Sequence, residues 1–277
     1  MALSRNMMGT IFVGGALTLT LSALAYPSML GLDTVSTSGD RIIANTQWGP
    51  LTEGDRDFVV KVRAAGLWEY PLGQLGLQKS QTPAIRTASN HLIDGHGALD
   101  TSCRKIAPML NIQLPNVASP QQEGFVTQLK AESGKQFDTD FANILRMTHG
   151  SIFNTIAKIR STTKNTLVRA LADQANDTVL DHITVMEKTG LVDFDTTLFN
   201  QTTPPKLPQS DMTPPVPPAG QPMVVLNPPP TATSTPLDLS GVVNGNPQPG
   251  NGQPGNGQPG NGQPGNGQPA GQPGTSQ

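Results

Sequence analysis

The sequence predicts an all-α protein whose folded part is a four-helix bundle, and three observations predict it. Apolar residues recur at alternating three- and four-residue spacing in four long segments. Helix-start patterns precede these segments. Residues 51–193 hold most of the charged residues and all four histidines. Because long amphipathic helices of similar length bury their apolar stripes against one another, we place a bundle domain at residues 51–193.

The first long helix is predicted at residues 53–79, because Thr52 and Asp55 form a capping-box pattern at its start. The second is predicted at residues 83–110, where Thr82–Pro83 places a cap residue before a proline in the first turn. Each helix has an apolar stripe with a polar residue inside it. The stripe of the first helix is Phe58, Val62, Ala65, Glu69 and Leu72. That of the second is Ile85, Ala88, Leu92, His96, Leu99, Cys103, Ile106 and Leu110.

The second half of the domain repeats this pattern. A short helix is predicted at residues 120–132, and long helices at residues 136–161 and 164–189. Ser133 and Gln136 form another capping-box pattern before the third long helix. The stripe of the third long helix is Phe141, Leu145, His149, Ile152, Ile156 and Ile159. That of the fourth is Leu171, Ala175, Thr178, His182 and Val185.

The predicted connections differ in length, and this difference indicates the topology. The links after the first and third long helices are only a few residues. The crossover between the second and third is far longer and contains the short extra helix. It is long enough to run back along the bundle. Two helical hairpins joined by one long crossover form a ferritin-like four-helix bundle, which we therefore expect.

The N-terminal segment predicts export. Arg5 precedes an uncharged, mostly apolar stretch at residues 7–25, which ends in an A-x-A cleavage pattern. We interpret residues 1–25 as a signal peptide, and residues 26–50 as a polar lead-in segment. The protein is then secreted or associated with the cell envelope, with no stable transmembrane domain once the signal is cleaved. An uncleaved N-terminal membrane anchor is the alternative, because the apolar stretch is just long enough to span a bilayer.

The C-terminal part of the sequence has a different composition. Residues 200–277 hold only three charged residues, Lys206, Asp211 and Asp238. They lead through a Pro-rich stretch into low-complexity NGQPG repeats that begin at Asn251. Such a composition offers little apolar surface to offset the entropy of ordering. We therefore expect residues 200–277 to be a disordered tail.

Charge and motifs exclude several classes of protein. Lys and Arg total 18 against 20 Asp and Glu, for a net charge of −2, whereas a nucleic-acid-binding protein normally has a basic excess. The single cysteine excludes an internal disulfide and any CxxC-type zinc or redox site. The sequence has no H-E-x-x-H, G-x-S-x-G or P-loop motif. These observations argue against an enzyme of those classes and favour a non-catalytic protein.

Four polar residues interrupt the apolar stripes, one in each long helix: Glu69, His96, His149 and His182. Buried polar groups need partners, so the four must bind one another, water or an ion. One interpretation is a mononuclear metal site of three imidazoles and a carboxylate, which suits one Zn, Cu or Fe ion. The other is a hydrogen-bonded polar layer in which Glu69 holds the histidines. The sequence alone leaves both open.

The same helices argue against other sites. A di-iron or di-manganese centre in such a bundle needs Glu-x-x-His pairs, but the residues three before the histidines are Ile93, Arg146 and Val179. His91 lies off the apolar stripe and is expected at the surface. Cys103 lies on the stripe and is expected to be a buried, unreactive thiol.

Residues 51–193 resemble a family of exported bacterial proteins known as domain of unknown function 4142. The matching motifs are Asp55-Arg56-Asp57-Phe58, Gly66-Leu67-Trp68-Glu69, Leu72-Gly73, Leu92-Ile93-Asp94-Gly95-His96, Phe137-Asp138, His149 and Asp181-His182. The resemblance implies a ferritin-like helical bundle and an export route, and it implies no established activity. The chain departs from the family pattern at Gly95, where the family usually has an acid, and at Pro71.

Together, these observations favour a non-catalytic binding or structural module of the cell envelope, whose partners are envelope components rather than nucleic acid. In that interpretation the bundle acts through its surface while the tail holds it at a distance. The alternative is a ferritin-like domain that binds one transition-metal ion and serves in redox chemistry or metal buffering.

Overall fold

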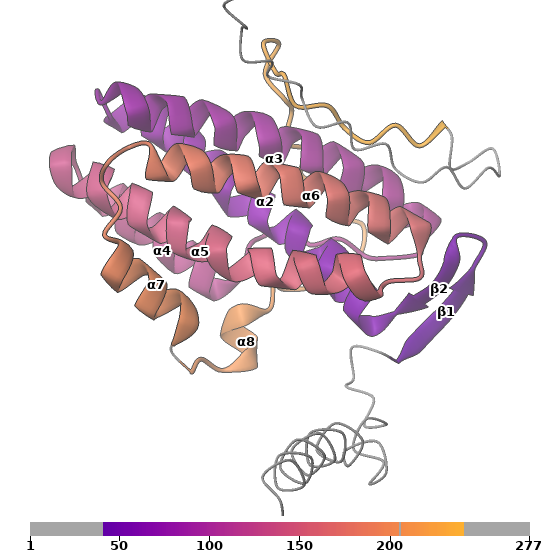
Figure 1. Ribbon diagram of the computed structural model, residues 1–277. Coiled ribbons are helices and arrows are strands. Elements are labelled where there is room, and N and C mark those ends of the chain that lie inside the picture. Colours follow the sequence, from indigo (N-terminus) through magenta and orange to yellow (C-terminus); the bar gives the residue numbers. More distant parts are fainter. Residues whose placement is uncertain (1–40, 205, 241–277) are drawn as a thin grey trace, which may run out of the picture.

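The structure is a computed structural model, which describes residues 41–204 and 206–240. Over these residues the protein is mostly helical, as predicted (Figure 1). The predicted signal peptide at residues 1–25 and the repeats beyond residue 240 lie outside the described residues. Among the described residues, no helix combines the length and the hydropathy that crossing a membrane requires.

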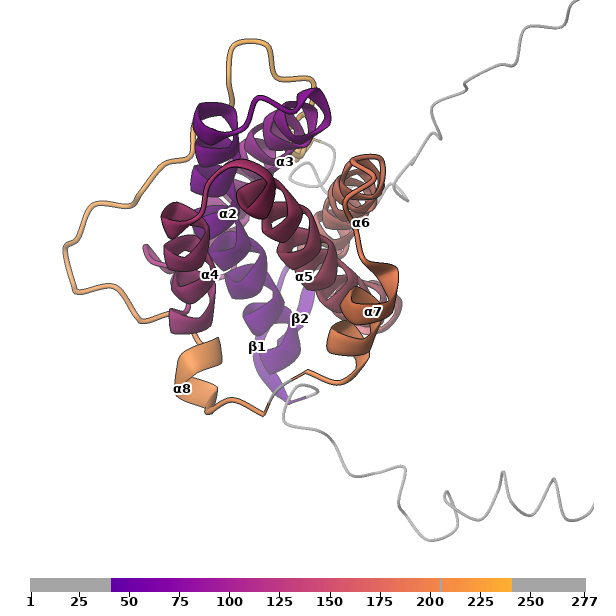
Figure 2. The same cartoon turned by 90° about the vertical axis from the view of Figure 1, so that its left-hand side faces the viewer.

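Four long helices form the body of the protein: α2 (Glu53–Lys79), α3 (Pro83–Met109), α5 (Gly134–Thr162) and α6 (Thr166–Glu187). Their ends differ from the predicted ones by no more than about two residues. The predicted capping box forms at the start of α2, where Thr52 and Asp55 bond to each other's main chain. Helices α2 and α3 pack side by side, as do α5 and α6, and α3 also packs on α6 (Figures 1 and 2). We call these four helices the helical body.

The interior of the helical body consists of two apolar clusters. One includes Phe58, Val62, Leu99, Ile156 and Val179, and lies toward the start of α2 and of α6. The other includes Trp68, Leu72, Leu92, Phe141 and Met186, and lies toward the opposite ends of the same helices. Each long helix contributes to both clusters, so each helix crosses the boundary between them.

Three short helices flank the helical body. Helix α4 (Pro120–Ala131) lies in the crossover between α3 and α5, as predicted. Helix α7 (Phe194–Thr202) packs on α5, and α8 (Gln209–Met212) packs on α4 (Figure 2). Asn143 of α5 holds the segment before and within α7 through hydrogen bonds to residues 191–197. The ferritin-like order of connections stays a prediction.

A two-stranded antiparallel hairpin departs from the all-α expectation and from the expected lead-in at residues 26–50. It consists of β1 (Ile42–Thr46) and β2 (Gly49–Thr52) and lies at one end of the helical body (Figure 1). Gly49 turns the chain with φ of 104°, a conformation that favours glycine. The hairpin attaches to α6 because Thr166 N–H donates to the Trp48 carbonyl at 2.8 Å. The strands are only five and four residues long, which is too short to give a periodic signal in the sequence.

The expected disorder from residue 200 also differs from the structure over residues 206–240. There the chain passes from α8 across α2 to the outer side of α3 (Figures 1 and 2). Leu226 of this segment is buried. Several main-chain groups of the segment bond to side chains of the helical body; for example, the Val224 carbonyl accepts from Arg63 and the Leu226 N–H donates to Asp100. Composition alone could not indicate this order, because the helices supply the partners.

Candidate metal centre

The four polar residues of the apolar stripes meet at the boundary between the two apolar clusters. Glu69 comes from α2, His96 from α3, His149 from α5 and His182 from α6. Each offers one ligand atom, and these atoms all lie within 4.8 Å of one another. The residues are between 0% and 5% exposed. All four predicted site residues are therefore brought together in one buried group.

The contacts within this group are short. The carboxylate oxygen Oε2 of Glu69 lies 3.0 Å from Nε2 of His96 and 3.0 Å from Nε2 of His149. The same Nε2 of His149 lies 2.9 Å from Nδ1 of His182. One carboxylate oxygen and three imidazole nitrogens thus surround a common point.

Main-chain carbonyls fix the outward nitrogens of two of these rings. Nδ1 of His149 lies 2.7 Å from the carbonyl oxygen of Leu145, one turn earlier in α5. Nε2 of His182 lies 3.0 Å from the carbonyl oxygen of His91 in α3. A carbonyl only accepts hydrogen bonds, so both outward nitrogens carry a proton. In the neutral rings the two inward nitrogens then present lone pairs to each other across 2.9 Å.

Two lone pairs at that distance repel unless a cation lies between them. A proton or a metal ion can fill this role. A histidine that donates its outer N–H to a carbonyl while its other nitrogen points inward has the arrangement found around protein-bound metals. The cluster is therefore organised to hold either cation.

Charge within the cluster decides where a proton resides without metal. Burial alone would favour the neutral acid of Glu69, but His149 and His96 hold its pKa well below its usual range. Burial disfavours the imidazolium of His149, yet attraction and hydrogen bonding to Glu69 raise its pKa above the ordinary value. Burial, together with His149 and His96, lowers the pKa of His182 well below the ordinary value. In the metal-free cluster, the surroundings thus favour the carboxylate of Glu69, the imidazolium of His149 and the neutral ring of His182.

Close packing of α3 on α6 brings His182 into place. A Cβ atom added at Gly95 would lie 2.7 Å from Nε2 of His182. Glycine at this position therefore leaves room for the ring and for its bond to the His91 carbonyl. Gly95 is therefore part of the wall of the cluster.

His96 differs from the other two histidines. Its Nδ1 is buried and has no hydrogen-bond partner within the described residues. This nitrogen faces Gly66 of α2, where an added Cβ would lie 3.8 Å away. The third imidazole is therefore held by packing and by Glu69 alone.

The two remaining candidates lie apart from the cluster. The side chain of His91 is 39% exposed and pairs with Asp181 at 2.6 Å on the surface. Cys103 is buried, and burial raises the pKa of its thiol to about 12. Neither belongs to the group of convergent ligand atoms.

Sequence reasoning missed the groups that orient the cluster. The Leu145 carbonyl lies one helical turn before His149, so helical spacing could have indicated it. The His91 carbonyl lies on a different helix, and no residue pattern indicates that contact. The role of Gly95 depends on the contact between α3 and α6, which no residue pattern indicates.

Comparisons with known proteins give one match. A family model described as "Domain of unknown function (DUF4142)" matches residues 43–189, which include the hairpin from Ile43 onward and all four residues of the cluster. No curated protein and no solved structure matches significantly.

Proposed function

The chain belongs to the DUF4142 family, and because that family is described only as a domain of unknown function, we propose a function from the cluster itself. The protein binds one transition-metal ion between Glu69, His96, His149 and His182. The observation that carries this proposal is the convergence of one carboxylate oxygen and three imidazole nitrogens, all within 4.8 Å of one another, in a buried group.

The donor set fits a single ion. Three imidazole nitrogens and one carboxylate oxygen suit Zn(II), Cu(II) or Fe(II). In a tetrahedral site with metal–ligand distances of about 2.0–2.1 Å, the ligand atoms lie roughly 3.3 Å apart. Three of the observed separations are 2.9 to 3.0 Å and the others lie within 4.8 Å, so some pairs of ligand atoms must open slightly and others must close to hold the ion. With one carboxylate in the group, the site favours one ion over two.

The depth of the cluster favours holding a metal over turning over a substrate. All four ligands are at most 5% exposed, and apolar side chains lie on either side of them. A buried ion of this kind serves metal buffering or, with copper or iron, electron transfer. The signal-like segment at residues 1–25 supports such a role outside the cytoplasm.

Elemental analysis of variants tests the proposal. The purified chain, loaded with Zn(II) and dialysed, is expected to hold about one ion per chain, while His149→Ala is expected to lose at least about tenfold in affinity because it removes a ligand. His91→Ala is the matched control, since it removes an imidazole outside the cluster and keeps the carbonyl that orients His182. Substoichiometric metal in the unaltered chain, or equal binding by His149→Ala, would overturn the proposal.

A second candidate function rests on a different observation. One proton at Nε2 of His149 satisfies both Glu69 and His182, so the cluster is also consistent as a buried polar layer without metal. The protein would then be a non-catalytic module that binds cell-envelope components through its surface. The elemental analysis separates the two functions, because only the first gives one bound ion per chain.

A further inference from the structure

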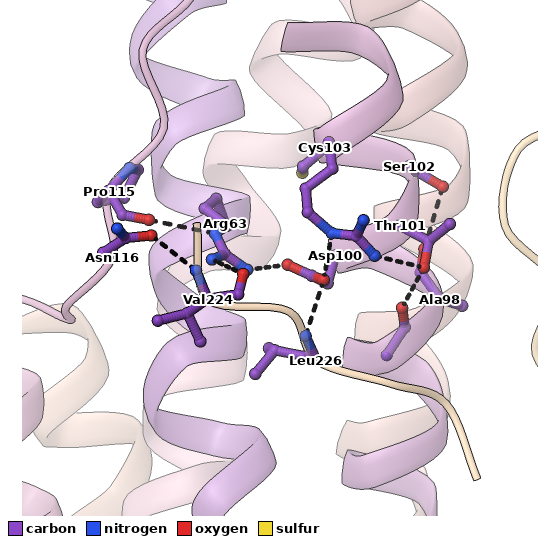
Figure 3. A network of polar contacts seen from close by, with 12 residues as sticks. Arg63, Ala98, Asp100, Thr101, Ser102, Cys103, Pro115, Asn116, Val224 and Leu226 are labelled. Atoms are coloured by element: carbon purple, nitrogen blue, oxygen red, sulfur yellow. Dashed lines mark hydrogen bonds and ion pairs between the residues drawn. The ribbon is translucent and has the colours of Figure 1, made fainter. Parts of the chain in front are cut away.

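Residues 222–237, which we call the strap, lie against α2 and α3 and bond to both helices. Buried side chains of the helical body bond to its main chain (Figure 3). Arg63 donates to the Val224 carbonyl at 2.7 Å. Asn116, in the crossover after α3, donates to the Pro222 carbonyl at 3.0 Å and accepts from the Val224 N–H at 3.0 Å. The helical body and the crossover therefore hold the strap through its main-chain groups.

The side chains beneath the strap include a buried ion pair. The side chains of Arg63 and Asp100 are 0% and 1% exposed and form an ion pair. Asp100 also accepts from Arg104 at 2.8 Å and from the Leu226 N–H at 3.0 Å (Figure 3). Burial lowers the pKa of Arg63 to about 10, so it remains cationic at neutral pH. Without the strap, both charges would lose a hydrogen-bond partner, which is costly for buried groups.

Two other residues of α3, one before Asp100 and one after it, also bond to the strap. Asp94 accepts hydrogen bonds from the N–H groups of Thr233 and Ser234 at 2.8 Å and 3.1 Å. The Leu237 N–H donates to the hydroxyl of Ser102 at 2.9 Å. The anchors at Asp94 and Asp100 lie on either side of His96 in the same helix.

Between these anchors the strap covers the His96 side of the cluster. A Cβ at Gly66 would lie 3.0 Å from Cδ1 of Leu226 and 3.8 Å from Nδ1 of His96. A Cβ at Gly97 would lie 2.8 Å from Cα of Pro228. The two glycines thus let the strap reach the backbone of α2 and α3 beside His96. The unpartnered Nδ1 of His96 lies on this same side.

From these contacts we infer that the strap is a gate over the metal centre. Local release of residues 222–237 uncovers the His96 side of the cluster and is the route by which the ion enters and leaves. The strap lacks helix and strand, so it can detach without disrupting the hydrogen bonds within the four helices. Its release also lets water reach the Nδ1 of His96. This inference rests on the proposed metal-binding function.

The rate of metal release tests the gate. The full chain is loaded with Co(II) and mixed with excess chelator, and the loss of the cobalt absorption is followed. Asn116→Ala removes two strap bonds at a position away from the cluster, so release is expected to accelerate about tenfold. Leu226→Ala is a second variant, made in the strap itself. Hydrogen exchange of residues 222–237 is expected to accelerate in both variants.

Asn143→Ala is the matched control. It removes an asparagine that holds residues 191–197 rather than the strap, and release is expected to stay within about twofold of the unaltered chain. If both strap variants bind one ion, show faster hydrogen exchange in the strap and release cobalt at the unaltered rate, the gate is refuted while the metal site stands. If the unaltered chain binds no ion, the proposed function and the gate fall together.

Discussion

At the scale of single residues, the central feature is Nε2 of His149, where under the proposed function a proton and a metal ion would compete for one position. The proton resides there because Glu69 raises the pKa of this ring, and a metal must displace it. His182 does not compete in the same way, because its pKa is lowered and it is already neutral. Under the proposed function, a metal ion at this cluster would therefore displace a proton from His149.

This competition predicts a pH dependence of affinity. Below the raised pKa of His149, the apparent affinity for Zn(II) is expected to fall about tenfold for each unit of decreasing pH, because one proton must leave. Above that pKa the affinity is expected to level off. Titrations against a competing chelator, from about pH 5.5 to 8.5, measure this profile. An affinity that does not change with pH would contradict the assignment of the proton to His149.

The four residues of the cluster could be predicted from the sequence, and the orientation of their rings could not. Glu69, His96, His149 and His182 each replace an apolar residue in a helical stripe, which marks them as inward-facing. Which nitrogen of each ring points inward depends on carbonyls of the folded backbone. That information arises only when α3 and α6 are in contact.

At the scale of elements, the close approach of α3 and α6 determines the geometry of the cluster. Gly95 allows this approach, since its α-hydrogen occupies the space next to the His182 ring. The long helices were predictable from spacing and capping residues. The hairpin and the strap were not, because Thr166 and Arg63, which hold them, belong to other parts of the chain.

The close packing of α3 on α6 predicts the effect of adding a methyl group at position 95. Gly95→Ala would place a Cβ 2.7 Å from Nε2 of His182, so the ring must shift and its bond to the His91 carbonyl must weaken. We expect a loss of about 1–3 kcal/mol in the free energy of unfolding, together with weaker metal binding. Denaturant unfolding and zinc titration measure the two effects.

Gly124→Ala in α4 is the control for this substitution. Nothing lies within 4 Å of a Cβ at that position, so the methyl group adds helix propensity without a clash. We expect it to leave metal binding unchanged and to raise stability by at most about 1 kcal/mol. Equal behaviour of the two variants would show that the packing of α3 on α6 does not position His182.

At the scale of the whole molecule, the buried histidines make stability depend on pH in the absence of metal. Below about pH 6.5, His182 is protonated in the unfolded chain but stays neutral in the folded chain, because its pKa is lowered there. The free energy of unfolding therefore falls as pH decreases. Above about pH 6.5 the folded chain keeps a proton on His149 that the unfolded chain has lost. The stabilisation that this proton gives to the folded chain is lost as pH rises through the raised pKa of His149.

The two histidines therefore predict a maximum in the melting temperature of the chelator-treated chain near about pH 6.5. Glu69, whose pKa is lowered, adds a further loss of stability below the ordinary carboxylate range. His149→Gln is the control, because it lacks the titrating ring and should lose the decline above about pH 6.5. Thermal melting followed by circular dichroism measures both, and a decline of unchanged steepness in His149→Gln would contradict the prediction.

The division of the interior into two apolar clusters has a consequence for how the molecule melts. Each of the four long helices supplies side chains to both clusters, so every helix is packed at two separate positions along its length. Unfolding of a helix in one cluster therefore also disrupts the packing of the same helix in the other cluster. Damage at the polar boundary should therefore lower the temperature of one concerted transition, instead of producing a species with one half intact and the other half molten.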